Sequence, residues 1–104
     1  MGLNKIFDEL FLERQSQDKK WGEQNHPDGT GVSVLTESIR WDLLIARERY
    51  KEDFELGKHT WQEILNEEVL EAFNERNPAE LRKELIQVAA VAIAWIEAID
   101  RRAE

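Results

Sequence analysis

The sequence contains no cysteine, and it has only two prolines and five glycines among 104 residues. The absence of cysteine excludes disulfides and metal sites built on thiolates. Few residues break helices, and the apolar residues recur at three- and four-residue spacing instead of alternating, a pattern that favours helices throughout. We therefore predict an all-α protein in which residues 1–104 form a single domain.

The sequence also has no excess of basic charge, because it contains 22 acidic and 14 basic residues and its net charge is −8. Such a surface repels the nucleic-acid backbone, and no basic stripe offsets it, so we expect no nucleic-acid partner. A free nucleotide carried as its magnesium complex is a different case. There the ion brings the positive charge, and clustered carboxylates attract it.

Long hydrophobic runs are absent as well. The longest, residues 85–96, contains a glutamine and is too short to cross a bilayer. Residues 1–15 are charged throughout and have no apolar core of the signal-peptide kind. We expect no membrane association and a cytoplasmic location.

Several local signals mark the ends of helices. Gly57 is suited to stop a helix, Thr60 and Glu63 have the spacing of a capping box, and Asn77-Pro78 is suited to start the last helix. The predicted helices cover residues 3 to about 20, 33 or 36 to about 56, 61 to about 76, and 78 to about 102. The short connection before Pro78 makes the last two helices antiparallel neighbours.

The last helix is apolar nearly all the way round over residues 85–96. A helix of this kind is buried on several sides, and a domain this small can hardly cover it alone. We therefore predict a four-helix bundle-like fold whose last helix is shared in a homo-dimer or homo-tetramer. The alternative is a central helix within a monomeric bundle.

Two pairs of polar residues stand out on the last two helices. Glu68 and Glu71 are three residues apart, as are Glu84 and Gln87, so each pair projects from one face of its helix. Because Glu71 lies six residues before Asn77 and Glu84 seven after it, we expect the pairs at similar heights. Three carboxylates and an amide oxygen suit Mg²⁺ or Mn²⁺. The alternative is a solvated acidic face, since glutamate is a good helix former.

The sequence EEVLE at residues 67–71, followed after twelve residues by ELIQ at 84–87, resembles a known signature. It is similar to the EExxE…ExxD pattern of MazG-like, all-α nucleoside triphosphate pyrophosphohydrolases. The likeness covers residues 60–102 well and extends more loosely to the N-terminus. It implies a MazG-type fold and Mg²⁺-dependent hydrolysis of a nucleoside triphosphate to a monophosphate and pyrophosphate. It also implies a house-cleaning role in the nucleotide pool.

The resemblance also assigns roles to single residues. Glu68, Glu71 and Glu84 would be metal ligands, and Glu67 would help to bind metal or orient and deprotonate the attacking water, so Glu67 and Glu68 are the catalytic candidates. The family has aspartate where this chain has Gln87, whose amide oxygen would replace a carboxylate at the cost of one charge. Alternatively, Gln87 is a core amide, and the chain is a non-catalytic helical module that binds nucleotides or a protein partner.

Four further residues are candidates for contact with the substrate. Trp21 and Trp41 can stack on a base, and His26 can hydrogen-bond to a base or a phosphate. The alternatives are core indoles and a solvated histidine. The resemblance implies that a cation such as Arg14 neutralises phosphates across an oligomer interface. The polar loop at residues 23–31 is long enough to act as a lid, and without a GxxxxGK[ST] pattern it is no P-loop.

Overall fold

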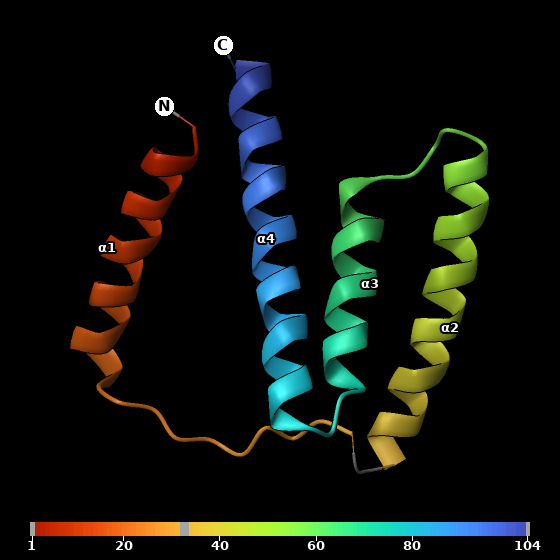
Figure 1. Cartoon of the computed structure of the whole chain (residues 1–104), viewed down its shortest axis with the longest axis horizontal. Coiled ribbons are helices and arrows are strands. Elements are labelled where there is room, and N and C mark those ends of the chain that lie inside the picture. The colour runs from red at the N-terminus through yellow and green to blue at the C-terminus, as the bar shows by residue number, and fades with distance from the viewer. Residues whose placement is uncertain (1, 32–33, 104) are drawn as a thin grey trace. The chain divides into compact units, whose positions relative to one another are not determined.

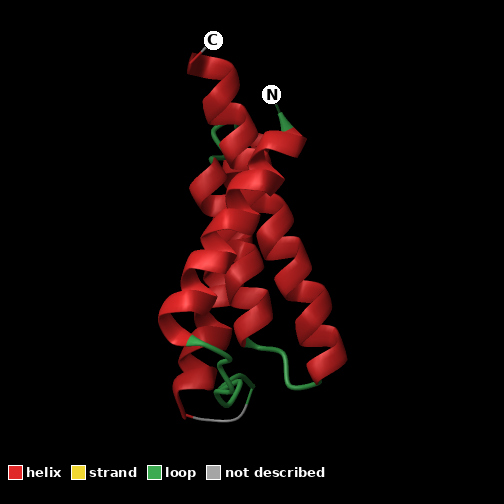
Figure 2. Cartoon of the chain, turned by 90° about the vertical axis from the view of Figure 1, so that its left-hand side faces the viewer, coloured by secondary structure: helices red, strands yellow, loops and turns green. Residues whose placement is uncertain are grey.

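The computed structural model of the chain describes residues 2–31 and 34–103, without the side chains of residues 34–37. Over these residues the chain is helical and contains no strand (Figures 1 and 2). The helices are α1 (Leu3–Trp21), α2 (Val34–Glu55), α3 (Trp61–Phe73) and α4 (Pro78–Ala103). The all-α prediction is confirmed. Position 33, one of the two predicted starts of the second helix, lies outside the described residues.

The chain divides into two compact units. Met1–Asp28 and Ile93–Glu104 form one unit, which contains α1 and the last turns of α4. Gly29–Ala92 forms the other, which contains α2, α3 and the first turns of α4. None of the described helices combines the length and the apolar character needed to span a membrane.

Within the unit Gly29–Ala92, helices α2 and α3 run antiparallel and pack against each other (Figure 1). Leu43 of α2 and Ala72 of α3 are buried, and so is Leu81 near the start of α4. At the connection between α2 and α3, the ring of His59 lies 5.0 Å from that of Phe54 and 6.0 Å from that of Tyr50, measured between centroids. The aromatic contacts therefore lie at the connected end of the two helices, whereas Ala72 is buried near the other end of α3.

The predicted helix boundaries at Gly57, Thr60 and Asn77 are confirmed. The hydroxyl oxygen of Thr60 accepts a hydrogen bond from the backbone N–H of Glu63 at 3.2 Å. The side-chain oxygen of Asn77 accepts one from the N–H of Ala79 at 2.8 Å. Gly57 has a φ of 69°, the left-handed conformation that glycine adopts after a helix C-terminus. Local capping chemistry therefore decides where α3 and α4 begin.

The predicted end of the third helix near Arg76 is wrong, because α3 ends at Phe73. The side-chain amide of Asn74 donates to the carbonyl of Leu70 at 2.7 Å, and the N–H of Gly31 donates to the carbonyl of Phe73 at 3.2 Å. In a longer helix that carbonyl would accept from residue 77 instead. Gly31 has a φ of 75°, and a Cβ there would collide with Arg76, so this close approach needs glycine.

Many large apolar side chains are exposed in the single chain. Of the residues on α1, Ile6 is buried, but Phe7 and Phe11 are 50% and 63% exposed. On α4, Leu85 and Ile86 are 49% and 55% exposed. The apolar faces of α1 and α4 are therefore wider than one chain covers, and the burial predicted for residues 85–96 in an oligomer stays a prediction.

Candidate metal centre

Helices α3 and α4 bring three carboxylates together. Glu68 and Glu71 of α3 and Glu84 of α4 each offer an oxygen, and these oxygens all lie within 4.8 Å of one another. The short turn between Phe73 and Pro78, closed by the Asn77 cap, sets the height of one helix against the other. The predicted pairing across this turn is confirmed for the three glutamates.

The donor set of these three residues fits a divalent cation. In an octahedral Mg²⁺ site adjacent ligands lie about 3 Å apart and opposite ligands about 4.2 Å apart, so three oxygens within 4.8 Å of one another need only small side-chain shifts to bind one ion. One oxygen each of Glu68 and Glu84 is buried and has no hydrogen-bond partner. Such an oxygen is costly to leave unsatisfied, and a cation would satisfy it. Carboxylate oxygens are the ligands that Mg²⁺ and Mn²⁺ prefer.

Electrostatics at the site follow from four crowded glutamates, Glu67, Glu68, Glu71 and Glu84, here called the acidic cluster. Burial raises the pKa of Glu68, and the charges of the other three members raise it further. Burial likewise raises the pKa of Glu84, together with the charge of Glu71 and a hydrogen bond to it, and then the charges of two nearby glutamates. The site therefore holds negative charge at a free-energy cost in the absence of a cation.

Arg47 on α2 is a member of the site that the sequence interpretation missed. Its Nη2 lies 3.2 Å from Oε1 of Glu71, and its Nε lies 3.8 Å from Oε1 of Glu67. Burial and then the charge of Glu71 raise the pKa of Glu67, while Arg47 lowers it. Arg47 lies one helical turn after Leu43, which the structure shows to be buried, but the sequence alone does not fix which side of α2 faces the glutamates. A cation at that position faces the helix that carries the glutamates.

Gln87 lies on α4 three residues after Glu84, and its side chain is exposed. The alternative interpretation of Gln87 as a packed core amide is therefore wrong for the single chain. A ligand role for its amide oxygen stays a prediction.

The four candidates for substrate contact are all exposed. Trp41 is 67% exposed on α2, in the unit of the acidic cluster. Trp21, His26 and Arg14 belong to the other unit. There the Nζ of Lys20 lies 4.9 Å from the ring centroid of Trp21, and Arg14 pairs with Asp18 at 2.9 Å. The two indoles are not core side chains, and a role for any of the four in binding stays a prediction.

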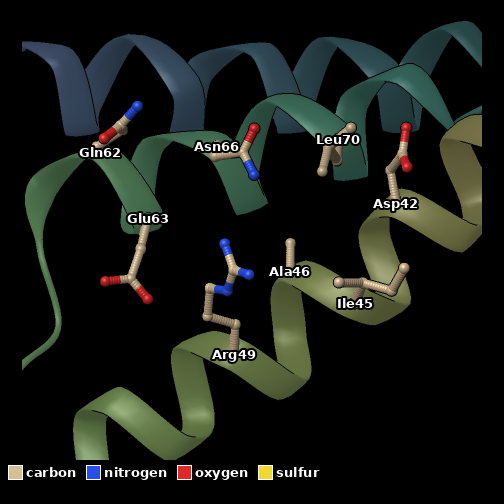
Figure 3. Close-up of a pocket in the computed structure, with 8 residues that line it drawn as sticks. All are labelled: Asp42, Ile45, Ala46, Arg49, Gln62, Glu63, Asn66 and Leu70. Atoms are coloured by element: carbon tan, nitrogen blue, oxygen red, sulfur yellow. The ribbon is translucent and has the colours of Figure 1, made fainter.

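A groove of about 430 Å³ opens between α2 and α3 (Figure 3). Figure 3 shows the guanidinium of Arg49 reaching from α2 toward Glu63 and Asn66 on α3. Because Asn66 and Glu68 are two residues apart, they point to different sides of α3. The residues that line the groove include none of the acidic cluster, and the sequence interpretation did not foresee this groove. Its lining consists of Asp42, Ile45, Ala46, Arg49, Gln62, Glu63, Asn66 and Leu70.

Comparison of the chain with protein-family models, with curated proteins and with solved structures finds no match. Function is therefore inferred from the geometry and charge of the acidic cluster, together with the resemblance of residues 67–71 and 84–87 to the MazG-like signature.

The raised pKa values predict the pH dependence of stability in the metal-free protein. A carboxyl whose pKa is raised binds its proton more tightly in the folded state, so stability falls as the pH rises from the ordinary value of 4.5 through the raised pKa. We expect Glu84→Gln to raise the free energy of unfolding at neutral pH by roughly 0.5 kcal/mol, because it removes a charge that burial and then repulsion by Glu71 disfavour. This gain in the free energy of unfolding should vanish at a pH below the ordinary pKa of 4.5, where the wild-type carboxyl is protonated in both states.

Urea unfolding with a chelator across this pH range measures the effect. Glu52→Gln, an exposed glutamate on α2, is the matched control and should change little. A loss of stability in Glu84→Gln at neutral pH would show that the charge is favourably paired and would contradict the prediction.

Proposed function

We propose that this chain is a Mg²⁺-dependent nucleoside triphosphate pyrophosphohydrolase of the MazG-like kind, which releases pyrophosphate and a nucleoside monophosphate. The observation that carries the proposal is the convergence of Glu68, Glu71 and Glu84, whose oxygens lie within 4.8 Å of one another. Two buried, unpartnered carboxylate oxygens support it. The resemblance to the EExxE…ExxD signature supports the choice of substrate, and with it a house-cleaning role.

In this proposal Glu68, Glu71 and Glu84 hold Mg²⁺ or Mn²⁺, and the amide oxygen of Gln87 takes the place that the signature gives to aspartate. The ion, when bound, polarises the phosphate and lowers the pKa of the attacking water. The acidic cluster repels a bare triphosphate, so the substrate is the cation complex of the nucleotide.

Glu67 is the proposed base. It lies on α3 next to the ligand Glu68, and burial raises its pKa toward the range in which a carboxylate accepts a proton more readily. The attacking water breaks the P–O bond between the α- and β-phosphates, and its oxygen becomes part of one product. Glu67 takes a proton from that water, and the products are the nucleoside monophosphate and pyrophosphate. Glu68 serves as a metal ligand, and its carboxylate adds a negative charge close to those of Glu67, Glu71 and Glu84.

We also propose that the chain assembles into a homo-dimer or homo-tetramer through α4. Leu85 and Ile86 are about half exposed there, with the exposed small residues Ala89 and Ala90 close by. An exposed apolar stretch of this kind on a helix is typical of an interaction surface, and small residues let a second helix approach closely.

The second candidate function is a non-catalytic helical module that binds nucleotides or a protein partner. The observation that favours it is Gln87, which removes one negative charge from the fourth place of the signature. Pyrophosphate release separates the two functions.

The enzymatic proposal is tested by measuring pyrophosphate release from a panel of ribo- and deoxyribonucleoside triphosphates with Mg²⁺ or Mn²⁺. We expect activity in the wild type and a loss of at least about 100-fold in Glu71→Gln, which removes one ligand charge. Glu63→Gln is the matched control, since Glu63 lies on the same helix but lines the groove, and it should stay active. A wild type that releases no pyrophosphate would overturn the enzymatic proposal.

Gln87→Asp restores the fourth carboxylate of the signature. We expect Mg²⁺ to bind about tenfold more tightly, because a charge is added beside the cation. Since the side chain is exposed, stability without metal should change by less than about 0.5 kcal/mol. Melting curves over a Mg²⁺ titration measure both effects. Gln62→Glu adds the same charge on α3 in the groove and serves as control. Equal metal responses of Gln87→Asp and wild type would remove Gln87 from the site.

Ile86→Glu tests the assembly. Ile86 is 55% exposed in the single chain, so a charge there should leave the helices intact and break an interface on α4. We expect sedimentation to show a smaller species than the wild type, with an unchanged circular dichroism spectrum. Gln24→Glu, an exposed loop position with the same change of charge, should assemble normally. A wild type that is monomeric at micromolar concentration would refute the proposed oligomer.

A further inference from the structure

Arg47 is the cation that the structure places on the acidic cluster. Its guanidinium pairs with Glu71 at 3.2 Å and with Glu67 at 3.8 Å, and both contacts cross from α2 to α3. Among the described residues, no other lysine or arginine forms an ion pair with these four glutamates. When all four glutamates are ionised, the charge of the cluster and Arg47 together is −3 (four negative charges and one positive).

This contact places Arg47 in competition with a divalent cation. Glu71 supplies an oxygen to the group of three and an oxygen to Arg47 at the same time. A guanidinium beside the site repels a second cation by Coulomb's law, and it also holds a carboxylate that the cation needs. Removal of the positive charge of Arg47 must therefore strengthen the binding of a metal ion alone.

The same guanidinium can also bind phosphate. Arginine has five N–H donors in a rigid fork that matches phosphate oxygens, and the two ion pairs engage only Nε and Nη2. The side chain is 49% exposed, so its remaining donors are accessible from solvent. A phosphate chain held at the three carboxylates would bring its oxygens beside this arginine and form charge-assisted hydrogen bonds.

We propose that Arg47 is a positioning residue with two successive partners. In the metal-free protein it neutralises Glu67 and Glu71, and when a cation–nucleotide complex is bound it transfers its guanidinium to the phosphates. The inference rests on the proposed function and extends it, because it names the residue that recognises the phosphate chain. It requires effects of opposite sign, since Arg47 weakens the binding of a metal alone and strengthens the binding of a metal–phosphate complex. A purely structural residue would not produce that pair of signs.

Calorimetry on Arg47→Gln tests both signs. Titration with Mn²⁺ alone should show binding about three- to tenfold tighter than in the wild type, because a nearby positive charge is gone. Titration with inorganic tripolyphosphate in the presence of Mg²⁺ should show binding about tenfold weaker, because the guanidinium contacts are lost. Arg47→Lys should keep the wild-type Mn²⁺ affinity but lose part of the tripolyphosphate affinity, since an ammonium lacks the planar fork.

Arg49→Gln is the matched control, with the same change of charge on the same helix. Arg49 lines the groove and reaches toward Glu63 and Asn66 (Figure 3), and among the described residues it forms no ion pair with the acidic cluster. Both affinities should therefore equal those of the wild type. Circular dichroism should show that each variant keeps its helices, because both arginines are exposed.

An unchanged or weaker Mn²⁺ affinity in Arg47→Gln would overturn the inference, and so would an unchanged affinity for tripolyphosphate. Failure of the enzymatic proposal looks different. In that case the wild type binds Mn²⁺ and tripolyphosphate and the two signs hold for Arg47, yet no nucleotide yields pyrophosphate. A wild type that binds neither probe would overturn both proposals.

Discussion

Repulsion among four glutamates is the interaction on which the candidate site depends. Burial is the largest cause of the raised pKa values of Glu67, Glu68 and Glu84, and the close spacing of the carboxylates on α3 and α4 raises these values further. Arg47 relieves part of the charge, and within the cluster one buried oxygen each of Glu68 and Glu84 has no hydrogen-bond partner. A fold that keeps such an arrangement is prepared for a cation, because bound positive charge would turn a cost into a stabilising contact.

The packing of the helices serves to hold this charge in place. The caps at Thr60 and Asn77 set where α3 and α4 begin, and the short turn between the helices brings Glu71 level with Glu84. Contact between α2 and α3 then brings Arg47 to the cluster from a third helix. Each of these steps depends on polar side chains at helix ends or faces, while the few buried apolar residues supply only the framework.

Features that depend on residues close together in the chain were predicted from the sequence, whereas features that depend on contacts between distant residues were missed. Caps and three-residue spacings act within one turn, so the boundaries at Thr60 and Asn77 and the glutamate pairing followed from short stretches. The end of α3 did not, because it depends on Gly31 bonding to Phe73. Arg47 was missed because the apolar residues of α2 spread too widely around the helix to fix which side faces α3. Trp41, Leu44 and Ile45 are among these residues, and all three are exposed. The spacing of apolar residues identifies the apolar face of a helix, but it does not identify the helix against which that face packs.

The contact of Gly31 with the turn after α3 has a consequence for the order in which the chain can gain structure. The hydroxyl of Thr30 donates to the carbonyl of Glu75 across a separation of 45 residues, so this contact closes a long loop and costs chain entropy before it forms. The turn from α3 to α4 spans only a few residues. Loss of the long-range contact would leave that turn intact, so the glutamates of the two helices can remain level while residues 30 and 31 separate from the turn.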